Sequence, residues 1–139
     1  MTGKVFVDSN VLVYAHDQDA GVKQLRAAER LRELWENGLG RLSTQVLQEF
    51  YVTVTQQIPR PLARSLAREV IRNYGLWAES LITPSTVVRA SEISEAWKLA
   101  FWDGMIFAAA EQDGAEFLLS EDWNPGQVIA GSRVVNPFL

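Results

Sequence analysis

The segment Val-Phe-Val-Asp-Ser-Asn at residues 5–10 indicates the fold most directly. Its first three residues form an apolar run without polar alternation, which is typical of a strand buried on both faces of a parallel sheet. Asp8 follows at the expected strand end, and Ser9 and Asn10 are residue types that cap the start of a helix. Ligands bind beyond the carboxyl ends of the strands in open α/β sheets, so Asp8 is a candidate for chemistry. Taken alone, the segment is also explained by Asp8 acting only as a helix cap.

Composition limits the kinds of site that this chain can build. The 139 residues fit a single domain over residues 1–139, and 47% apolar residues are enough for a substantial core. The absence of cysteine excludes disulfides, zinc-thiolate sites and thiol nucleophiles. The single histidine, His16, excludes a multi-histidine metal site. Any metal must therefore be held by oxygen atoms.

Hydropathy and charge indicate a soluble, cytoplasmic protein with no membrane partner. No apolar run approaches the ~20 residues of a membrane span, and the first residues lack the pattern of a signal peptide. The net charge of −4 argues against bulk attraction to nucleic acid. If the negative charge is concentrated in one cluster that a divalent cation neutralises, the remaining surface can still be locally basic.

Short apolar segments alternate with longer amphipathic ones along the rest of the chain. We expect strands at 5–7, 41–43, 80–83, 116–119 and 133–135, and helices at 11–14, 22–36, 45–56, 61–74, 84–99 and 104–110. Pro61 is suited to the first position of its helix, and Gly75 to the end of it. This alternation predicts an α/β fold with a parallel sheet.

Acidic residues stand at two of the expected strand ends. Asp8 follows the first strand, and Asp122 lies three residues beyond Leu119. Neighbouring strands are ~4.8 Å apart, so two such carboxylates can reach one cation if the strands are adjacent. Asp103 stands where the helix at 104–110 would be capped, and Glu49 lies at the edge of the apolar stripe of its helix. A helix cap and an ordinary flanking glutamate are the simpler interpretations of these last two.

Five motifs, in this order and spacing, resemble those of a known family. They are Val-Phe-Val-Asp-Ser-Asn at 5–10, Ser-Thr-Gln-Val-Leu-Gln-Glu-Phe-Tyr at 43–51, Phe-Trp-Asp-Gly-Met-Ile-Phe-Ala-Ala-Ala at 101–110, Leu-Leu-Ser-Glu-Asp at 118–122 and Asn-Pro-Phe at 136–138. The chain resembles the PIN-domain nucleases and, among them, the VapC-type toxins of bacterial and archaeal toxin–antitoxin modules. The resemblance spans nearly the whole length.

The resemblance implies a three-layer α/β/α fold with a central parallel sheet and a site for Mg²⁺ or Mn²⁺. The acids that match the family's site are Asp8, Glu49, Asp103 and Asp122, and the supporting polar positions are Asn10 and Ser120. Glu121 adjoins the last acid position, but the motif aligns at Asp122. Gly104 departs from the family, in which an alanine is common. The implied activity is that of an endoribonuclease toxin that acts on RNA and is restrained by a cognate antitoxin. The resemblance also implies a homodimer.

The chemistry of the residues agrees with this assignment. Crowded carboxylates repel one another, and an acid cluster without basic partners is suited to a metal ion. Oxygen ligands without histidine or cysteine select Mg²⁺ or Mn²⁺ over zinc. A metal that activates water and stabilises the leaving oxygen removes the need for a histidine base.

Other interpretations are compatible with parts of the sequence. An aspartate-based phosphatase normally has a second Asp two residues after the first, where this chain has Asn10. A catalytically inactive binding module could keep the fold, although the four acid positions argue against it. Two basic stripes could contact an RNA backbone or could be solvated helix faces. They are Lys23, Arg26 and Arg30, opposite the expected apolar face of Leu25, Ala28, Leu31, Leu34 and Trp35, and then Arg64, Arg68 and Arg72.

Overall fold

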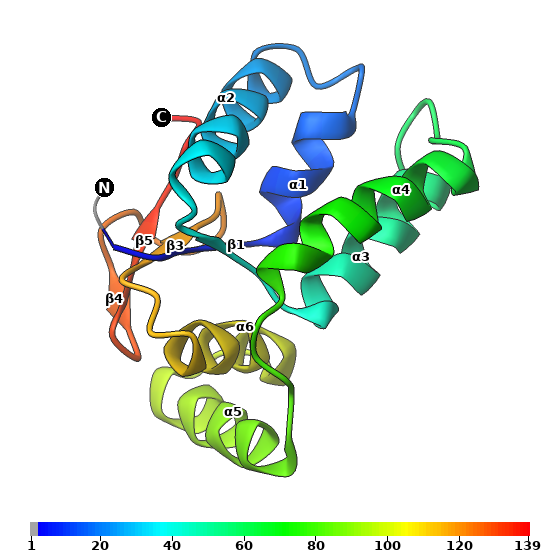
Figure 1. Ribbon diagram of the computed structural model, residues 1–139. Coiled ribbons are helices and arrows are strands. Elements are labelled where there is room, and N and C mark those ends of the chain that lie inside the picture. Colours follow the sequence, from blue (N-terminus) through cyan, green and yellow to red (C-terminus); the bar gives the residue numbers. More distant parts are fainter. Residues whose placement is uncertain (1–2) are drawn as a thin grey trace.

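The computed structural model describes residues 3–139 and is drawn in Figure 1. Its strands are β1 (Val5–Val7), β2 (Gly40–Arg41), β3 (Phe117–Leu119), β4 (Val128–Ile129) and β5 (Ser132–Val135). Its helices are α1 (Ser9–His16), α2 (Val22–Asn37), α3 (Thr44–Gln56), α4 (Arg64–Tyr74), the 3₁₀ helix η1 (Gly75–Trp77), α5 (Pro84–Trp97) and α6 (Phe101–Gln112). The strands form one sheet in the order β2-β1-β3-β5-β4.

Helices cover both faces of this sheet. Figure 1 shows α1 and α2 on one side and α5 and α6 on the other, with α3 packed beside α1 and α4 packed against α3. The strand pairs are parallel except for β4 with β5. The predicted α/β fold with a central parallel sheet is therefore confirmed, with one antiparallel pair added at an edge. That pair was not predicted, because β4 is only two residues long.

The pairing of β1 with β3 positions the residues that follow these two strands at the carboxyl edge of the sheet. Both strands consist of apolar residues, and Val5 to Val7 are completely buried. Val7 lies opposite Leu119, and the Asp8 amide donates to the Leu119 carbonyl (3.0 Å). The residue after each strand is thereby brought to the same place, so Asp8 meets Ser120.

Two helices begin earlier than the sequence predicts. Asp8 itself is the N-cap of α1, since its side chain accepts from the Ser9 amide. The alternative that Asp8 caps the helix is therefore confirmed, and the caps expected at Ser9 and Asn10 were wrong. The cap of α6 is Ala100, and Asp103 lies in the first turn of the helix rather than before it. A carboxylate in a first turn is favoured by the helix dipole, and its side chain does not need to bond the backbone.

Two further expectations were wrong, and backbone hydrogen bonds near both segments show what the chain does there. The Leu62 amide donates to the Val54 carbonyl (2.8 Å), which holds residues 61–63 as a loop, so α4 begins at Arg64 and not at Pro61. The strand expected at 80–83 is absent from the described chain. The Trp77 carbonyl instead accepts from the Leu42 amide (3.2 Å), and the segment after it is irregular, with Leu81 exposed.

The buried face of α2 agrees with the predicted one in part. Ala27, Leu31 and Leu34 are buried, at the i, i+4 and i+7 spacing of one helix face, so the prediction was correct for Leu31 and Leu34. It was wrong for Leu25, Ala28 and Trp35, which are exposed. The helix thus leaves apolar side chains at its surface.

Gly104 is required by packing. A Cβ added there would lie 2.5 Å from the Ala90 carbonyl oxygen of α5, closer than atoms can approach. The departure from the family's common alanine therefore accompanies close contact between α5 and α6. Among the helices of residues 3–139, none has the length and apolar character needed to cross a membrane.

Candidate active site

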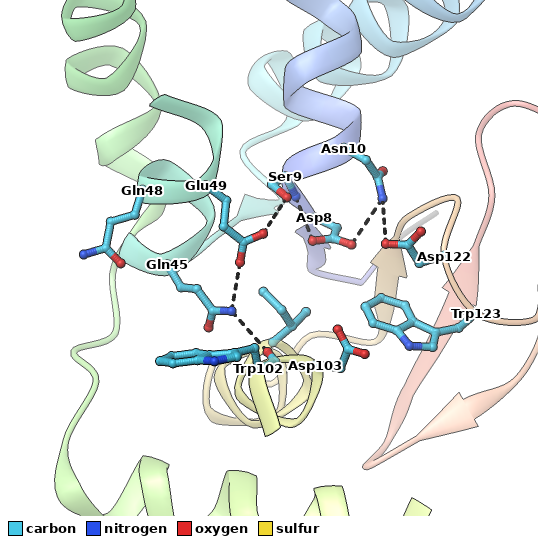
Figure 2. A pocket seen from close by; sticks show the side chains of 11 residues that line it. Asp8, Ser9, Asn10, Gln45, Gln48, Glu49, Trp102, Asp103, Asp122 and Trp123 are labelled. Carbon is cyan, nitrogen blue, oxygen red and sulfur yellow. Dashed lines mark hydrogen bonds between the residues drawn. The ribbon is translucent and has the colours of Figure 1, made fainter. Parts of the chain in front are cut away.

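A pocket of about 510 Å³ lies at the carboxyl edge of the sheet, between α1, α3, α6 and the loop after β3. All four predicted acids line it, and Figure 2 shows them around one space. The lining residues are Asp8, Ser9, Asn10, Gln45, Gln48, Glu49, Trp102, Asp103, Ile106, Asp122 and Trp123. The structure therefore brings together side chains from four separate segments of the chain.

Asp8 lies at the floor of the pocket and is the most buried of the four acids. Its Oδ1 accepts from the Ser9 amide (2.8 Å), and its Oδ2 accepts from Ser120 Oγ (2.8 Å). Burial raises the pKa of Asp8 to about 7, against the lowering effect of these hydrogen bonds, and the nearby Asp122 and Glu49 raise it further. At neutral pH this carboxyl group thus holds a proton for much of the time, unless a cation compensates for its charge.

Asn10 joins the two acids that follow the strands. Its Nδ2 donates to Asp8 Oδ2 (3.3 Å), to Asp122 Oδ2 (3.3 Å) and to Ser120 Oγ (3.1 Å). The Asp122 amide donates to Ser120 Oγ (3.0 Å). Both predicted supporting residues therefore hold the carboxylates directly, Asn10 through its amide and Ser120 through its hydroxyl.

Glu49 reaches the pocket from α3, where its side chain is exposed. Its Oε2 accepts from Ser9 Oγ (2.9 Å), and its Oε1 accepts from Gln45 Nε2 (2.9 Å). Gln45 Nε2 also donates to the Trp102 carbonyl of α6 (3.1 Å). These hydrogen bonds tie α3 to α1 on one side and to α6 on the other, so Glu49 is held at the α3 side of the pocket.

Asp103 points into the pocket from the first turn of α6 (Figure 2). It is half-buried, and the pKa of its carboxyl group is raised, first by burial and then by the charges of Asp122 and Glu49. The raised pKa values of Asp8 and Asp103 have the same origin, since both acids lose water and face other acids. The fold thus holds mutually repelling carboxylates together at this edge of the sheet.

Glu121 does not belong to the pocket, although it precedes Asp122. Its carboxylate accepts from Tyr14 Oη (2.6 Å) and from Lys23 Nζ (2.8 Å). Lys23 also lies over the rings of Tyr14 and Phe138, with Nζ 4.8 Å and 5.4 Å from their centroids. The pKa of Glu121 is lowered by the hydrogen bonds from Lys23 and Tyr14, which outweigh the opposing effect of burial. Asp122 and Glu121 therefore face different surroundings.

Sequence reasoning missed six of the residues around the pocket. They are Ser9, Gln45, Gln48, Trp102, Ile106 and Trp123. Five of them lie inside the five motifs and within four positions of an acid, but nothing in the sequence marked them as neighbours of one another. Trp123 lies outside the motifs, and its left-handed backbone (φ 63°) is uncommon for a bulky residue.

The charge of the pocket fits a divalent cation. Within the described residues, four acids line it and no lysine or arginine does. Oxygen ligands of this kind suit Mg²⁺ or Mn²⁺ in charge and chemistry. The side chains do not converge, however, because no group of three or more acids or histidines in residues 3–139 is arranged to hold an ion. The carboxylate of Glu49 is held by hydrogen bonds from Ser9 and Gln45.

Comparison with known proteins identifies the family. The sequence model of one protein family, the PIN domain, matches residues 5–129 of this chain, and this range includes all four acids of the pocket. The search of curated proteins finds no match. The matched region covers well over half of the sequence, and the observed sheet and helices agree with it. The chain therefore belongs to the PIN-domain family.

Proposed function

We propose that this protein is a metal-dependent endoribonuclease that hydrolyses RNA phosphodiester bonds. PIN domains are typically metal-dependent nucleases. The observation that carries the proposal is the gathering of Asp8, Glu49, Asp103 and Asp122 around one pocket, with no lysine or arginine among the described lining residues. Such a pocket is unfavourable for the fold on its own, and its acids suit a cation that binds phosphate.

These four acids are the groups that would hold Mg²⁺ or Mn²⁺. When bound, such an ion supplies an activated water and polarises the phosphate. The remaining residues have positioning roles. Ser120 and Asn10 orient Asp8, and Ser120 also fixes the backbone of Asp122. Ser9 and Gln45 hold the two oxygens of Glu49.

A toxin role, restrained by a cognate antitoxin in the cytoplasm, is the more specific part of the proposal. It is supported by the resemblance of the five motifs to the VapC-type toxins. Homodimerisation belongs to the same proposal, with α3 and α4 supplying part of the interface. Exposed Val52 on α3 and exposed Leu66 on α4 support this choice of surface.

The alternatives have less support. An aspartate-based phosphatase needs a general acid at the position of Asn10, and an amide cannot serve as one. The Asn10 amide instead donates to two carboxylates. An inactive binding module has no need for four acids around one pocket. It would also bear the cost of burying Asp8 without using its charge.

The test uses a labelled single-stranded RNA and the purified protein, with Mn²⁺ or with a chelator. We expect cleavage only with the metal, and loss of cleavage in Asp8→Asn and Asp103→Asn, since each change removes a charge with little change in volume. Glu36→Gln, which alters an exposed acid on α2 away from the pocket, is the matched control and should cleave normally. Full activity in either pocket variant would exclude the assignment.

The toxin role is tested separately by inducing the wild-type protein and Asp8→Asn in cells. We expect growth arrest with the wild type alone, and sequencing of RNA 5′ ends should then show new ends that the variant lacks. If cells grow normally although the purified enzyme cleaves RNA, the nuclease proposal stands and the toxin role is rejected. Light scattering at micromolar concentration tests the dimer, and a monomer would contradict it.

A further inference from the structure

Trp102 is a large apolar side chain exposed at the edge of the candidate active site. Its side chain is 66% exposed, although it lines the same pocket as the four acids. The indole packs edge-on against Phe101, with ring centroids 5.3 Å apart, and the Trp102 carbonyl accepts from Gln45 Nε2. The ring therefore has one aromatic neighbour, its backbone is tied to α3, and much of the ring surface stays in contact with water.

Trp123 forms a second aromatic wall of the pocket. Its ring lies edge-on to Phe107, with centroids 4.8 Å apart. The left-handed backbone of Trp123 (φ 63°) is costly for a bulky residue, and such conformations concentrate at functional sites. Figure 2 shows the Trp102 indole on one side of Asp103 and the Trp123 indole on the other. The acid thus lies between two aromatic surfaces.

Ionic contacts do not explain how a nucleic acid would be held beside these acids. No described lysine or arginine lines the pocket. Lys23 is paired with Glu121, Arg26 donates to the Phe138 carbonyl, and Arg30 pairs with Glu33. Phosphates next to the reacting one therefore meet no cation of this protein in the pocket. Among the uncharged residues that line the pocket, Trp102 and Gln48 are the exposed ones, and Trp123 is partly exposed.

We propose that Trp102, opposite Trp123, is a stacking site for an unpaired base of single-stranded RNA next to the cleaved phosphate. The inference rests on the proposed nuclease function and adds the residue that would contact a base beside the cleaved phosphate. Base-aromatic stacking tolerates any sequence, since every base has a π face. A base inside a duplex has both faces covered, so the site selects unpaired RNA. Gln48 offers a donor and an acceptor to the edge of the stacked base.

The test measures binding of a fluorescein-labelled ten-nucleotide oligouridine by anisotropy in Mn²⁺. All proteins carry Asp8→Asn so that the RNA is not consumed. We expect Trp102→Ala to weaken binding about fivefold or more, and Trp102→Phe to retain most of the affinity because the ring is kept. Trp97→Ala is the matched control, since Trp97 is an exposed tryptophan of α5 outside the pocket, and it should bind normally.

Abasic oligonucleotides separate stacking from a structural effect of the substitution. Single bases of the oligonucleotide are removed one position at a time. At one position the removal should weaken binding of the Asp8→Asn protein as much as Trp102→Ala does. With that abasic oligonucleotide, the proteins with and without Trp102→Ala should bind equally. A ten-base-pair duplex should compete poorly. The proposal is overturned if Trp102→Ala binds as the parent does, if no oligouridine binding is detected, if the duplex competes equally, or if the substitution changes only the oligomeric state in light scattering.

Cleavage of the same oligouridine by the protein with Asp8 intact distinguishes this proposal from the nuclease proposal. Binding that depends on Trp102, without any cleavage, would support the stacking site and remove the nuclease function. Cleavage that is the same for Trp102→Ala and the wild type, together with equal binding, would retain the nuclease function and remove the stacking site.

Discussion

The Glu121 carboxylate lies 2.8 Å from Lys23 Nζ, 98 positions away in the sequence, whereas the next residue, Asp122, lines the acidic pocket. Tyr14 Oη donates to the other oxygen of Glu121. The pairing of Glu121 with a cation outside the pocket leaves Asp122 as the acid of this loop that faces the other carboxylates. Two adjacent acids therefore have separate roles, one in fixing the loop and one in the site.

This separation predicts unequal effects of neutralising the two residues. Asp122→Asn should reduce RNA cleavage by more than the ~10- to 100-fold typical of residues that only support a metal ligand. Glu121→Gln should lower kcat/KM by less than about tenfold, because it removes a partly exposed ion pair but no charge that lines the pocket. The measurement is kcat/KM for one labelled RNA in Mn²⁺. The reverse order of effects would place the ligand at Glu121.

A second prediction follows from the raised pKa of Asp8, which is about 7 in the folded protein against 3.8 for an ordinary aspartate. The folded state binds the proton more tightly than the unfolded state does. The free energy of unfolding should therefore decrease as the pH rises from about 4 to about 7, by up to roughly 4 kcal/mol from this group.

Urea unfolding of the metal-free protein across this pH range checks the prediction. Asp8→Asn should lack this part of the decrease, because its amide does not titrate. The raised pKa values of Asp103 and Asp113 act in the same direction in both proteins and cancel in the comparison. If the free energies of unfolding of wild type and Asp8→Asn change with pH in parallel, ionisation of Asp8 does not destabilise the folded protein and the prediction is wrong.

The third prediction concerns the contact between α5 and α6. Gly104→Ala should destabilise the protein by about 1–3 kcal/mol, because the added Cβ meets the Ala90 carbonyl oxygen at 2.5 Å. Gly75→Ala is the matched control. Gly75 has a helical backbone (φ −56°) and open space at its Cβ position, so the change should be neutral or stabilising. Melting curves that rank the two variants the other way would contradict the packing described for α6.

The parts of the fold that sequence predicted are those with strong local patterns. The apolar runs of β1 and β3 are buried on both faces, so each could be recognised alone. The start of α4 could not, because Pro61 is a good first helical residue, and the bond from Leu62 to Val54, which accompanies the loop before α4, leaves no mark in the sequence. The turn at Ala130 and Gly131, with positive φ at both residues, creates the β4 and β5 pair without a strong strand signal.

The candidate site was predictable to the extent that it lies at strand ends. Asp8 and Asp122 were located by that rule, while Glu49 and Asp103 needed the resemblance to a family. The partners of these acids could not be predicted, since Ser9 and Glu49 are 40 positions apart and meet only through the packing of α1 on α3. The exposure of Trp102 likewise depends on where α6 begins.

The last prediction tests whether the four carboxylates act as one site. In chelator, the repulsion of Asp103 by Asp122 and Glu49 opposes folding, and its burial adds to this cost. Asp103→Asn should therefore leave the melting temperature unchanged or raise it, although it loses the ~0.3–1 kcal/mol by which the helix dipole favours an acid in a first turn.

Metal should then distinguish the two proteins. At a Mn²⁺ concentration ~100 times the dissociation constant, binding to the native state alone contributes about 2.7 kcal/mol, which corresponds to several degrees for a chain of this size. Wild type should show this rise, Asp103→Asn should lose most of it, and Glu36→Gln, outside the pocket, should keep it. Equal rises in wild type and Asp103→Asn, or no rise in wild type, would mean that these acids do not bind a common ion, whatever the activity of the protein on RNA.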